Sequence, residues 1–404
     1  MRTMLDCEGR ALNGMDHDVV IVGAGPAGLC FARALAGTGP RVHVLEKQSS
    51  DHVARPAFDG REIALTHTSV RALRELGVWE RIPAEETSPL RDALVMDGSS
   101  THALRIDHRD GRGERLGWLV PNHWIRRAAY EAVRDSGSAT IEAGVRVTGI
   151  GLAGSAIRLD LDDGRALHAR LVVAADSRYS ETRRAMGIAA SMHDFGKTML
   201  VCRMAHERPH DQVALEWFDY GQTLALLPLN GDCSSVVLTL PHTRVQPLLA
   251  LDEAAFAREI ERRFRYRLGT MRLLSTRHAY PLVGVYPRAF VAERFAVVGD
   301  AAVGMHPVTA HGFNLGLGGA VRLARLVRAA QAAGSDIASS ALLARYEHEH
   351  RSATRPLYLA TEVIATLYGQ DHLAARIVRR AALRLSQHVT PFRRALVGAL
   401  TRGA

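Results

Sequence analysis

Residues 18–46 read DVVIVGAGPAGLCFARALAGTGPRVHVLE. The four consecutive apolar residues at 19–22 predict a central parallel strand that is buried on both faces. Gly23 and Gly25 keep the following turn free of side chains, so the backbone can approach a pyrophosphate, and Gly28 lets the next helix pack against the strand. The unpaired N–H groups at the start of that helix favour a bound phosphate. Together these features predict a dinucleotide-binding unit.

Glu46 ends the second predicted strand of this unit, where a carboxylate accepts hydrogen bonds from a ribose. An acid here favours an adenosine ribose with free hydroxyl groups, as in FAD or NAD, over one with a 2′-phosphate. The segment GIGLAG at residues 149–154 also fits GxGxxG. The sequence after it alternates apolar and polar residues through an Asp163-Gly164 turn, which predicts a β-meander. Only the first motif is therefore followed by a helix that can hold a phosphate.

The composition is typical of a globular protein with one large or two interleaved domains, because 47% of the 404 residues are hydrophobic and 23% are charged. The four cysteines have neither zinc-site nor CxxC spacing, which favours a reducing compartment and argues against a metal site or a disulfide framework. No apolar run approaches the ~20 residues of a membrane-spanning helix, and the N-terminus lacks the apolar region of a signal peptide. We therefore expect a cytoplasmic protein. Residues 1–14 have no pattern and are expected to be a disordered tail or a misassigned start.

The C-terminal end carries much of the net charge of +9, since seven arginines and no acid follow Asp371. Apolar residues recur there every fourth position from Leu373 to Leu385, beside a row of arginines, which predicts a basic amphipathic helix. Such a helix fits an anionic membrane surface, a partner protein, or packing on its own domain with solvated arginines, and the sequence leaves these open. Nucleic acid is a poorer explanation of the charge because no recognition motif accompanies it.

Two later segments supply further ligand positions. Asp176 closes an apolar strand at residues 171–174, which is where α/β sheets bind ligands, although an ordinary acid-capped turn has the same pattern. Residues 294–320 read RFAVVGDAAVGMHPVTAHGFNLGLGGA, which predicts a buried strand, a loop with Asp300, and a long helix from Gly312. The N-terminus of that helix can stabilise an anionic ring such as a reduced flavin, and Asp300 can bond a ribityl hydroxyl.

Four other side chains are candidate site residues, each with more than one interpretation. His306 and His311 fit acid or base catalysis, but histidines in such loops are more often hydrogen-bond partners. Arg61, directly after a glycine and before an apolar pair, either reaches a cofactor or lies on the surface. Arg126 lies on a predicted helix at residues 122–133, with Asn122 as its cap, and is expected to face the nucleotide. Between these segments, four strand-like stretches at residues 195–240 predict a second, mostly antiparallel sheet that forms a substrate wall.

The chain resembles the aromatic-ring hydroxylases of the FAD-dependent monooxygenase superfamily, of the para-hydroxybenzoate hydroxylase type. The resemblance covers nearly the whole sequence and rests on three motifs in order: GAGPAG with Glu46, the motif at Asp176, and Gly299-Asp300 with its helix. The form HPxxxxGFNLGL at residues 306–317, together with GREIAL and LGVWERI, is similar in particular to the ubiquinone-biosynthesis hydroxylases. Among these, the chain looks most like the UbiM-like branch that acts on demethoxyubiquinol.

This resemblance implies FAD as cofactor, NAD(P)H and O2 as co-substrates, and a polyprenyl quinol or another aromatic small molecule as substrate. In the family a hydride passes to FAD, the reduced flavin takes up O2 as a C4a-hydroperoxide, and one oxygen atom enters the ring. For the branch named above, this is the 5-hydroxylation of 5-demethoxyubiquinol. A membrane-held substrate also fits a protein that docks on the inner membrane surface, or on a biosynthetic complex, through Arg376, Arg379, Arg380 and Arg384.

The motifs and the resemblance together give a set of expected cofactor-binding residues. Asp176 inherits contacts with the FAD pyrophosphate and the pyridine nucleotide, and Arg61 and Asn314 inherit places beside the flavin. The full set is Gly23, Gly25, Pro26, Ala27, Gly28, Glu46, Lys47, Arg61, Arg126, Asp176, Asp300, Pro307, Gly312, Phe313 and Asn314.

The expected fold is mixed α/β, with a Rossmann-like FAD-binding domain interleaved with a substrate-binding sheet domain and followed by a helical C-terminal region. The FAD-binding domain is expected at residues 15–82, 107–186 and 280–335. The sheet domain is expected at residues 83–106 and 187–279, and basic, amphipathic helices at residues 336–404.

Three departures from the family pattern indicate a subgroup with its own regiospecificity. Ser177 stands where the family has glycine after the acid, Ala310-His311 replaces Gly-Gln, and Gly318-Gly319 replaces Arg-Asp. They leave open a non-catalytic flavin-binding assembly subunit. Another monooxygenase or a prenyl reductase of the same fold also fits, whereas a halogenase is disfavoured because WxWxIP is absent. A plain NAD-dependent dehydrogenase leaves the Gly299 motif unexplained.

Overall fold

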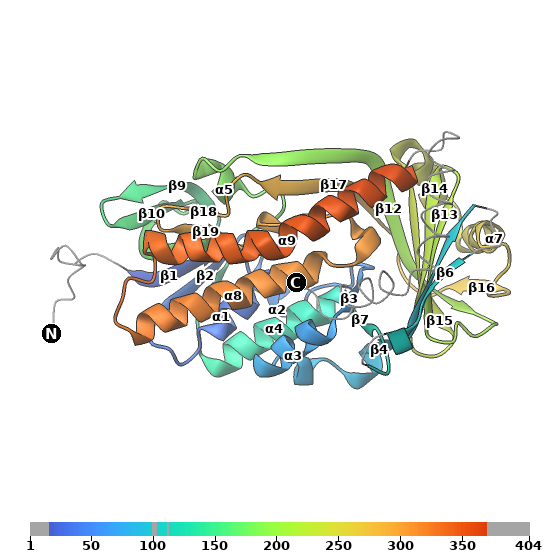
Figure 1. Ribbon diagram of the computed structural model, residues 1–404, viewed down its shortest axis with the longest axis horizontal. Coiled ribbons are helices and arrows are strands. Elements are labelled where there is room, and N and C mark those ends of the chain that lie inside the picture. Colours follow the sequence, from blue (N-terminus) through green and yellow to red (C-terminus); the bar gives the residue numbers. More distant parts are fainter. Residues whose placement is uncertain (1–15, 99–102, 111–112, 370–404) are drawn as a thin grey trace.

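The computed structural model describes residues 16–98, 103–110 and 113–369. Within them, a sheet covered by helices forms one end of an elongated molecule, and a second sheet forms the other (Figure 1). Two long strands, β12 (Ala190–His206) and β17 (His278–Pro287), pair with each other and run between the two ends. This arrangement confirms the expected mixed α/β fold class.

The first sheet has the strand order β18-β19-β11-β1-β2-β8, with β9 and β10 as a meander beside β11. Its central strand β1 pairs in parallel with β2 and β11, because residues 19–21 are fully buried and leave neither face for solvent. The strands are β1 (His17–Val22), β2 (Val42–Glu46), β8 (Thr140–Ala143), β9 (Val147–Ala153), β10 (Ala156–Leu161), β11 (Ala166–Ala174), β18 (Val291–Ala292) and β19 (Phe295–Val297). Residues 149–153 of GIGLAG lie on β9 and Gly154 lies in the turn to β10, so the prediction of a meander there is correct.

The second sheet has the order β16-β12-β15-β14-β13-β5-β6, with β17 beside β12, and only the β13–β5 pair is parallel. Its remaining strands are β5 (Asp92–Asp97), β6 (Ala103–Ile106), β13 (Val213–Asp219), β14 (Gln222–Pro228), β15 (Cys233–Pro241) and β16 (Met271–Leu273). Alternate side chains of these strands pack with α7 (Glu253–Arg263) into a second core. Because α7 covers the outer face, the other face looks toward the first sheet (Figure 1).

A small third sheet and the helices complete the described structure. Strand β7 (Gly117–Pro121) pairs with β3 (Glu62–Leu65) and β4 (Ser88–Leu90). The helices are α1 (Pro26–Ala34), α2 (Ser50–Ala54), α3 (His67–Glu75), α4 (Asn122–Ser136), α5 (Glu181–Ala185), α6 (Val245–Leu249), α8 (Gly312–Ala332) and α9 (Ser340–Gly369). Helix α9 runs along most of the molecule, from the first sheet toward the second (Figure 1).

One local expectation, the cap of α4, needs correction. Asn122 is not the cap of α4: Pro121 holds that position, and the Asn122 amide instead donates to Asp59 at 2.7 Å. Residues after Gly60 form strand β3 before the helix begins, because they pair with β7. Helix α7 ends at Arg263, and Arg265 and Tyr266 beyond it have positive φ values that a helix cannot contain.

One of the expected domain limits does not coincide with the strand pairing. Strand β17 crosses the expected limit at residue 280 and belongs to the second sheet through its pairing with β12. Residues 1–14 and the basic row at 373–385 lie outside the described residues. No helix in the described part of the chain is both long enough and apolar enough to cross a membrane.

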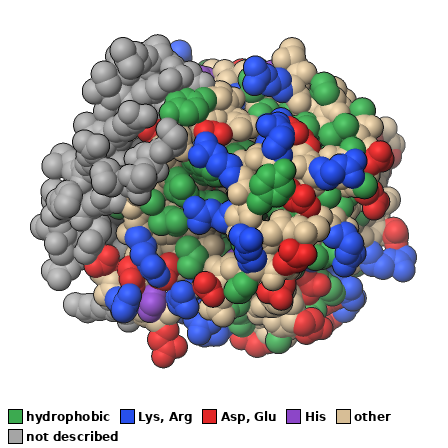
Figure 2. All heavy atoms as spheres, turned by 90° about the vertical axis from the view of Figure 1, so that its right-hand side faces the viewer, with side chains coloured by type: hydrophobic (Ala, Val, Ile, Leu, Met, Phe, Trp, Pro, Cys, Tyr) green, Lys and Arg blue, Asp and Glu red, His purple; other side chains and the backbone are tan. Residues whose placement is uncertain are grey.

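The end of the molecule that carries the second sheet shows a mixed surface. On the face in Figure 2, basic and acidic side chains alternate with apolar ones, and neither charge sign forms a continuous patch. Asp92, Asp107 and His108 bring possible metal-ligand atoms within 4.8 Å of one another. The Asp92 carboxylate already accepts from His108 and from Arg105 (2.8 Å), so we assign no metal there.

Candidate functional site

The carboxyl ends of β1, β2, β11 and β19 lie at one edge of the first sheet, because these strands run parallel to their neighbours. Three of the loops at this edge carry the motifs that the sequence singles out. They contain the glycine turn after β1, Asp176 after β11, and Gly299-Asp300 after β19. The carboxyl edge of a parallel sheet is where α/β proteins bind nucleotides.

The glycine turn needs glycine at two positions and leaves space at a third. A Cβ at Gly23, where φ is +110°, would lie 2.5 Å from the Ala175 carbonyl oxygen, and one at Gly28 would lie 2.3 Å from the Gly23 carbonyl oxygen. At Gly25 the nearest atom to a Cβ would be 3.8 Å away. Gly25 also begins α1 without a side-chain cap, with Pro26 as the first helical residue. The N–H groups at the start of α1 therefore face open space, as a phosphate requires.

Glu46 stands beside this turn. One carboxylate oxygen accepts from the Ala24 N–H at 2.8 Å and the other accepts from the Gln48 N–H at 2.9 Å. Each oxygen can accept a further hydrogen bond, so the carboxylate remains suited to ribose hydroxyls. Lys47, the next residue, is exposed.

Gly299 joins the first and last motifs. Its φ is +63°, and a Cβ there would lie 2.8 Å from the Ala27 Cβ, while a Cβ at Gly316 would lie 3.0 Å from the Gly299 Cα. The turn after β19 is therefore wedged between the start of α1 and α8. Asp300 follows it and forms an ion pair with Arg178 at 3.1 Å. Arg178, which the sequence reading missed, also donates to the Val283 carbonyl at 3.1 Å and so connects three distant segments.

The Asp176 carboxylate holds its own loop. It accepts from the Ser177 N–H at 3.0 Å and from the Thr182 hydroxyl at 3.1 Å. The φ of Ser177 is not positive, so serine in place of the family's glycine causes no backbone strain here. The nearby Arg183 side chain is fully buried and donates to the carbonyl oxygens of Arg178 and Ala301, both at 3.2 Å.

The start of α8 is open in the same way as the start of α1. A Cβ at Gly312 would meet only the Met305 side chain, at 3.8 Å, and the N-cap residue His311 gives no side-chain hydrogen bond to the helix. The His311 Nδ1 atom bonds instead to the Thr309 carbonyl. Ala310, where the family has glycine, takes the left-handed conformation with φ of +54°. The open N–H groups of α8 suit a negatively charged ring.

Arg61 is fixed toward the same region by Asp59. Its Nη2 atom lies 2.6 Å from the Asp59 carboxylate, and its guanidinium lies 5.5 Å from the centre of the Tyr280 ring. Burial by itself would raise the pKa of Asp59, but the Arg61 charge and the hydrogen bonds from Arg61 and Asn122 outweigh it and lower the pKa. The sequence analysis identified neither Asp59 nor Tyr280 as a site residue. The only indication in the sequence was that Asp59 lies two positions before Arg61, in Asp59-Gly60-Arg61.

Arg126 of α4 is a half-buried cation. Among the residues that the structure describes, none forms a hydrogen bond or an ion pair with its guanidinium, and burial lowers its pKa. Asp59 and Glu46 act on it only at longer range. An unpaired cation under these conditions is unfavourable unless an anion joins it, and a phosphate is a suitable anion.

Asn314 connects the two sides of the candidate site. Its Oδ1 accepts from the Thr66 N–H at 3.1 Å, and its Nδ2 donates to the carbonyl oxygens of Ala64 (2.8 Å) and Ala310 (3.1 Å). Its amide therefore ties the end of β3 to α8 and positions both. Pro307 begins a short helical turn before α8, and the half-buried Phe313 lies in the first turn of α8.

A cavity of about 170 Å³ lies between this loop and the second sheet. It is lined by His306 and Val308 of the loop, by Phe218, Thr223 and Thr239 of the sheet, by His193, Asp194, Phe195 and Lys197 of β12, and by Ala365 and Thr366 of α9. The His306 ring packs edge-on against Phe195 at 4.7 Å. Burial, assisted by Lys197 and His193, lowers the pKa of His306 to about 4, so its ring is neutral at pH 7. This weakens the case for His306 as a general acid.

These residues fit an FAD molecule. Two uncapped helix starts, a glycine turn with room in front of Gly25, a carboxylate at Glu46 and the unpaired Arg126 match a pyrophosphate, a ribose and an electron-rich ring system. The cavity between the second sheet and the loop that leads into α8 is suited to a small aromatic substrate. Fold and site together define an FAD-dependent monooxygenase.

Comparison with known proteins agrees with this class. The family model for the FAD binding domain matches residues 16–358. The chain is 41% identical over 399 residues to ubiquinone hydroxylase UbiM of Neisseria meningitidis, covering 98% of this chain and 86% of that one. It is 34% identical to ubiquinone hydroxylase UbiL of Rhodospirillum rubrum, covering 93% and 87%. Among solved structures, p-nitrophenol 4-monooxygenase of Pseudomonas putida has the same fold, with a TM-score of 0.78 at 19% identity over 96% of this chain and 99% of that one.

The chain therefore belongs to the FAD-binding-domain family, within the group of its ubiquinone hydroxylase relatives. The resemblance noted from the three motifs is confirmed, as is FAD as the cofactor. The roles of the individual site residues stay predictions.

Proposed function

We propose that this protein is a hydroxylase that uses FAD and NAD(P)H to insert one oxygen atom from O2 into the ring of a ubiquinone precursor. The ring position that we propose is the free carbon of 5-demethoxyubiquinol. The names of the relatives support this substrate class. The observation that carries the proposal is the cavity itself, because the loop leading into α8 and the inner face of the second sheet line the same space.

FAD, when bound, supplies the redox chemistry that activates O2. The chain's own groups prepare the surroundings: the open N–H groups of α8 stabilise negative charge on the ring system beside them. Arg61, oriented by its ion pair with Asp59, would offer guanidinium N–H donors to the bound cofactor. Phe195, Phe218 and Val308 exclude water from the reacting ring, and the neutral His306 adds no charge to the cavity.

Purified protein gives a direct test. We expect flavin absorbance bands, oxidation of NAD(P)H that a demethoxyubiquinol analogue with a short side chain accelerates, and a product heavier by one oxygen atom. Flavin without substrate-stimulated NAD(P)H oxidation would instead indicate a non-catalytic assembly subunit. In a strain that lacks the gene, accumulation of the demethoxy intermediate supports the proposed ring position, and a different intermediate reassigns it.

The basic C-terminal end supports a second part of the proposal, contact with the membrane that holds the substrate. Arg376, Arg379, Arg380 and Arg384 lie outside the described residues, so only their sequence pattern supports it. Co-sedimentation with vesicles of anionic lipid is expected to weaken when these four arginines are changed to glutamine. Unchanged co-sedimentation contradicts the membrane contact.

A further inference from the structure

Glu216 is a carboxylic acid in an apolar part of the second sheet. It takes part in none of the contacts described above. It lies on β13 between Leu215 and Trp217, which point into the core with α7. Because side chains alternate along a strand, Glu216 points to the opposite, inner face, as Phe218 does. Phe218 lines the cavity, so the same face of β13 carries a cavity residue two positions from Glu216.

The strand register shows what surrounds Glu216. On one side it pairs with Val95 of β5, which pairs with Leu104 of β6. On the other side it pairs with Ala225 of β14, which pairs with Val237 of β15 and then Val201 of β12. Glu216 is thus the single ionisable side chain in the cross-strand row between Leu104 and Val201, after which the row continues to His278 of β17. The adjacent row on the same face contains the cavity residues Phe218, Thr223 and Thr239.

No structural partner accounts for this acid. Within the described residues, no hydrogen bond or ion pair reaches its carboxyl group, and the Arg203 guanidinium on the same face is already bonded to Glu62 at 2.8 Å. Burial alone raises the pKa of Glu216 to about 8, so the group carries a proton at neutral pH. The Glu216 side chain still retains partial exposure, as do Thr223, Leu227 and Val237 on the same inner face. The acid is therefore surrounded by protein but accessible from the space in front of the sheet.

We propose that Glu216, on the sheet face next to the cavity residues Phe218 and Thr223, is a polar subsite that binds a substrate ring carrying two oxygen atoms on adjacent carbons. A protonated carboxyl group has one O–H donor and one carbonyl acceptor side by side. The carbonyl accepts the hydrogen of a ring hydroxyl, and the O–H donates to the neighbouring methoxy or hydroxyl oxygen. The apolar row of Val95, Ala225 and Val237 contacts the rest of the molecule and strengthens these hydrogen bonds by excluding water.

This inference rests on the proposed ring hydroxylase function, and binding measurements separate the two. The probes are 2-methoxyphenol, which has both ring oxygens, and methoxybenzene, which lacks the hydroxyl group. Dissociation constants for the FAD-loaded enzyme are measured by titration calorimetry at pH 7. We expect the enzyme to bind 2-methoxyphenol about tenfold more tightly than methoxybenzene, the effect of one net buried hydrogen bond.

Three variants test the assignment. Glu216→Gln keeps a donor and an acceptor and is expected to keep the tenfold preference, whereas Glu216→Leu is expected to lose it. Glu253→Leu, on the exposed start of α7 across the same sheet, is the matched control and keeps the preference. Thermal unfolding of Glu216→Leu is expected to occur at no lower temperature than in the parent, because the change removes an unpaired buried acid.

The outcomes discriminate clearly. An unchanged preference in Glu216→Leu, or no preference in the parent enzyme, overturns the subsite. If the parent hydroxylates the quinol analogue while Glu216→Leu keeps the preference, the subsite is wrong and the function stands. If the preference depends on Glu216 but no quinol analogue is hydroxylated, the subsite stands and the proposed function is wrong.

Discussion

Ala310 is a residue whose backbone conformation opposes its side chain. Its φ of +54° lies in the left-handed region, where a Cβ is crowded by about 1 kcal/mol. We predict that Ala310→Gly raises the free energy of unfolding by up to about 1 kcal/mol, less the greater flexibility of glycine in the unfolded chain. Urea unfolding measures the change. Ala250→Gly is the control, since φ there is −78° and glycine can only destabilise it. If both variants lose the same free energy of unfolding, the backbone of Ala310 is not strained.

Gly25 is a residue whose missing side chain leaves room for the cofactor. Its φ of −71° suits alanine, and a new Cβ would have no atom nearer than 3.8 Å. We predict that Gly25→Ala folds normally but binds FAD at least tenfold more weakly, because the methyl group fills the space before the α1 N-terminus. FAD titration of the apoprotein, followed by fluorescence, measures the affinity. Gly28→Ala, whose Cβ would lie 2.3 Å from a carbonyl oxygen, should instead destabilise the apoprotein. Parent-like FAD affinity in Gly25→Ala refutes this role.

Single residues also show how far sequence reasoning can reach. The glycine turn and Glu46 were predictable because strand, turn, helix and acid are contiguous in the chain. The three family departures look equivalent in sequence but differ in space. Ser177 has an ordinary backbone, Ala310 is strained, and Gly319 is required because a Cβ there would lie 2.8 Å from the His350 ring. That ring comes from a helix 31 positions further along, so no local pattern reveals the requirement.

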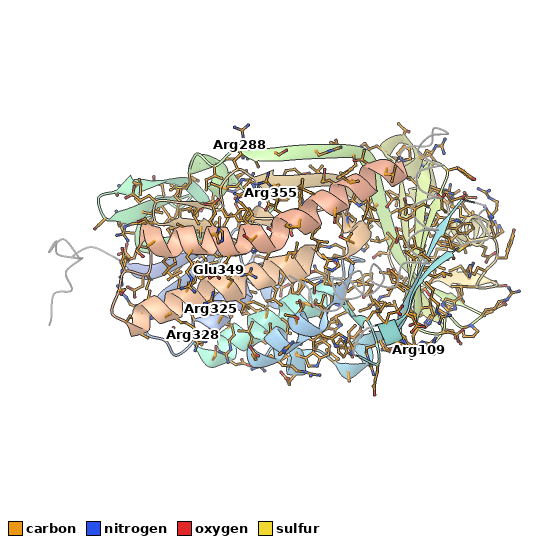
Figure 3. The ribbon with its side chains drawn as sticks, in the orientation of Figure 1. Arg109, Arg288, Arg325, Arg328, Glu349 and Arg355 are labelled. Carbon is orange, nitrogen blue, oxygen red and sulfur yellow. The ribbon has the colours of Figure 1, made fainter. Side chains whose placement is uncertain are left out.

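Helices α8 and α9 pack through Gly319 and His350. The absence of a side chain at Gly319 admits the His350 ring, whose Nδ1 atom lies 3.1 Å from Arg322. Outside this contact, Arg325 of α8 and Glu349 of α9 form an ion pair at 2.6 Å, and Figure 3 shows both residues on neighbouring helices. The fully buried His350 is therefore enclosed between the helices, and the nearby Arg322 and Arg351 charges add to the effect of burial.

This packing makes stability depend on pH. Burial lowers the pKa of His350 to about 3 and that of His306 to about 4, below the usual 6.5. The unfolded chain therefore binds protons first, so the contribution is complete above pH 6.5 and is lost as the pH falls. We predict a decrease of about 1.4 kcal/mol per pH unit for each histidine between pH 6 and pH 4.5. Urea unfolding at several pH values measures the slope.

Two variants separate this effect from the titration of carboxylates. His350→Phe introduces a ring of similar shape that cannot be protonated. The slope of its free energy of unfolding against pH should be smaller by the amount that corresponds to about one proton. His348→Phe, two positions away on α9, is the control and should keep the parent slope because the His348 side chain is exposed. Parallel slopes in the parent and His350→Phe would exclude His350 as the source.

Contacts between elements that are distant in the chain were harder to predict than the elements themselves. Four strands of the second sheet, β12 to β15, were recognisable at least in part from their apolar residues, since each strand carries its own pattern. Asn122 was expected to cap α4, yet its amide reaches Asp59 in a loop more than 60 positions earlier. A capping rule considers only neighbours in sequence, whereas this hydrogen bond is decided by where β3 and β7 place the loop.

At the scale of the whole molecule, the candidate FAD site draws on segments that are far apart in the chain, from Gly23 through Asp176 to Gly312. Ligands that bind only the folded state stabilise it by mass action. We predict that FAD at 100 times its dissociation constant adds about 2.7 kcal/mol to the free energy of unfolding. Thermal unfolding of the apoprotein at increasing FAD concentration measures this, with riboflavin, which lacks the ADP part, as the weaker control. An unfolding temperature that is independent of FAD contradicts the site.

The division into domains was the least predictable feature at this scale. Periodicity located part of β12 as a strand, but it located neither β17 nor the pairing of these two strands between the two ends. That pairing depends on contacts between residues 77 to 97 positions apart, and it brings residue 280 into the second sheet. The cavity likewise combines β12, the loop at His306 and α9, so its lining could not be listed from any single motif.

The placement of β1 between β2 and β11 has a consequence for how the protein is made. Strand β2 follows β1 within 25 residues, but β11 begins at residue 166 and the start of α8 at Gly312. At a synthesis rate of roughly 5–20 residues per second, about 15 to 60 seconds separate the appearance of Gly28 from that of Gly312. Until β11 has been synthesised, the nascent chain exposes an apolar edge of β1 that has no partner. Flavin loading therefore belongs to a late stage, after most of the polypeptide has left the ribosome.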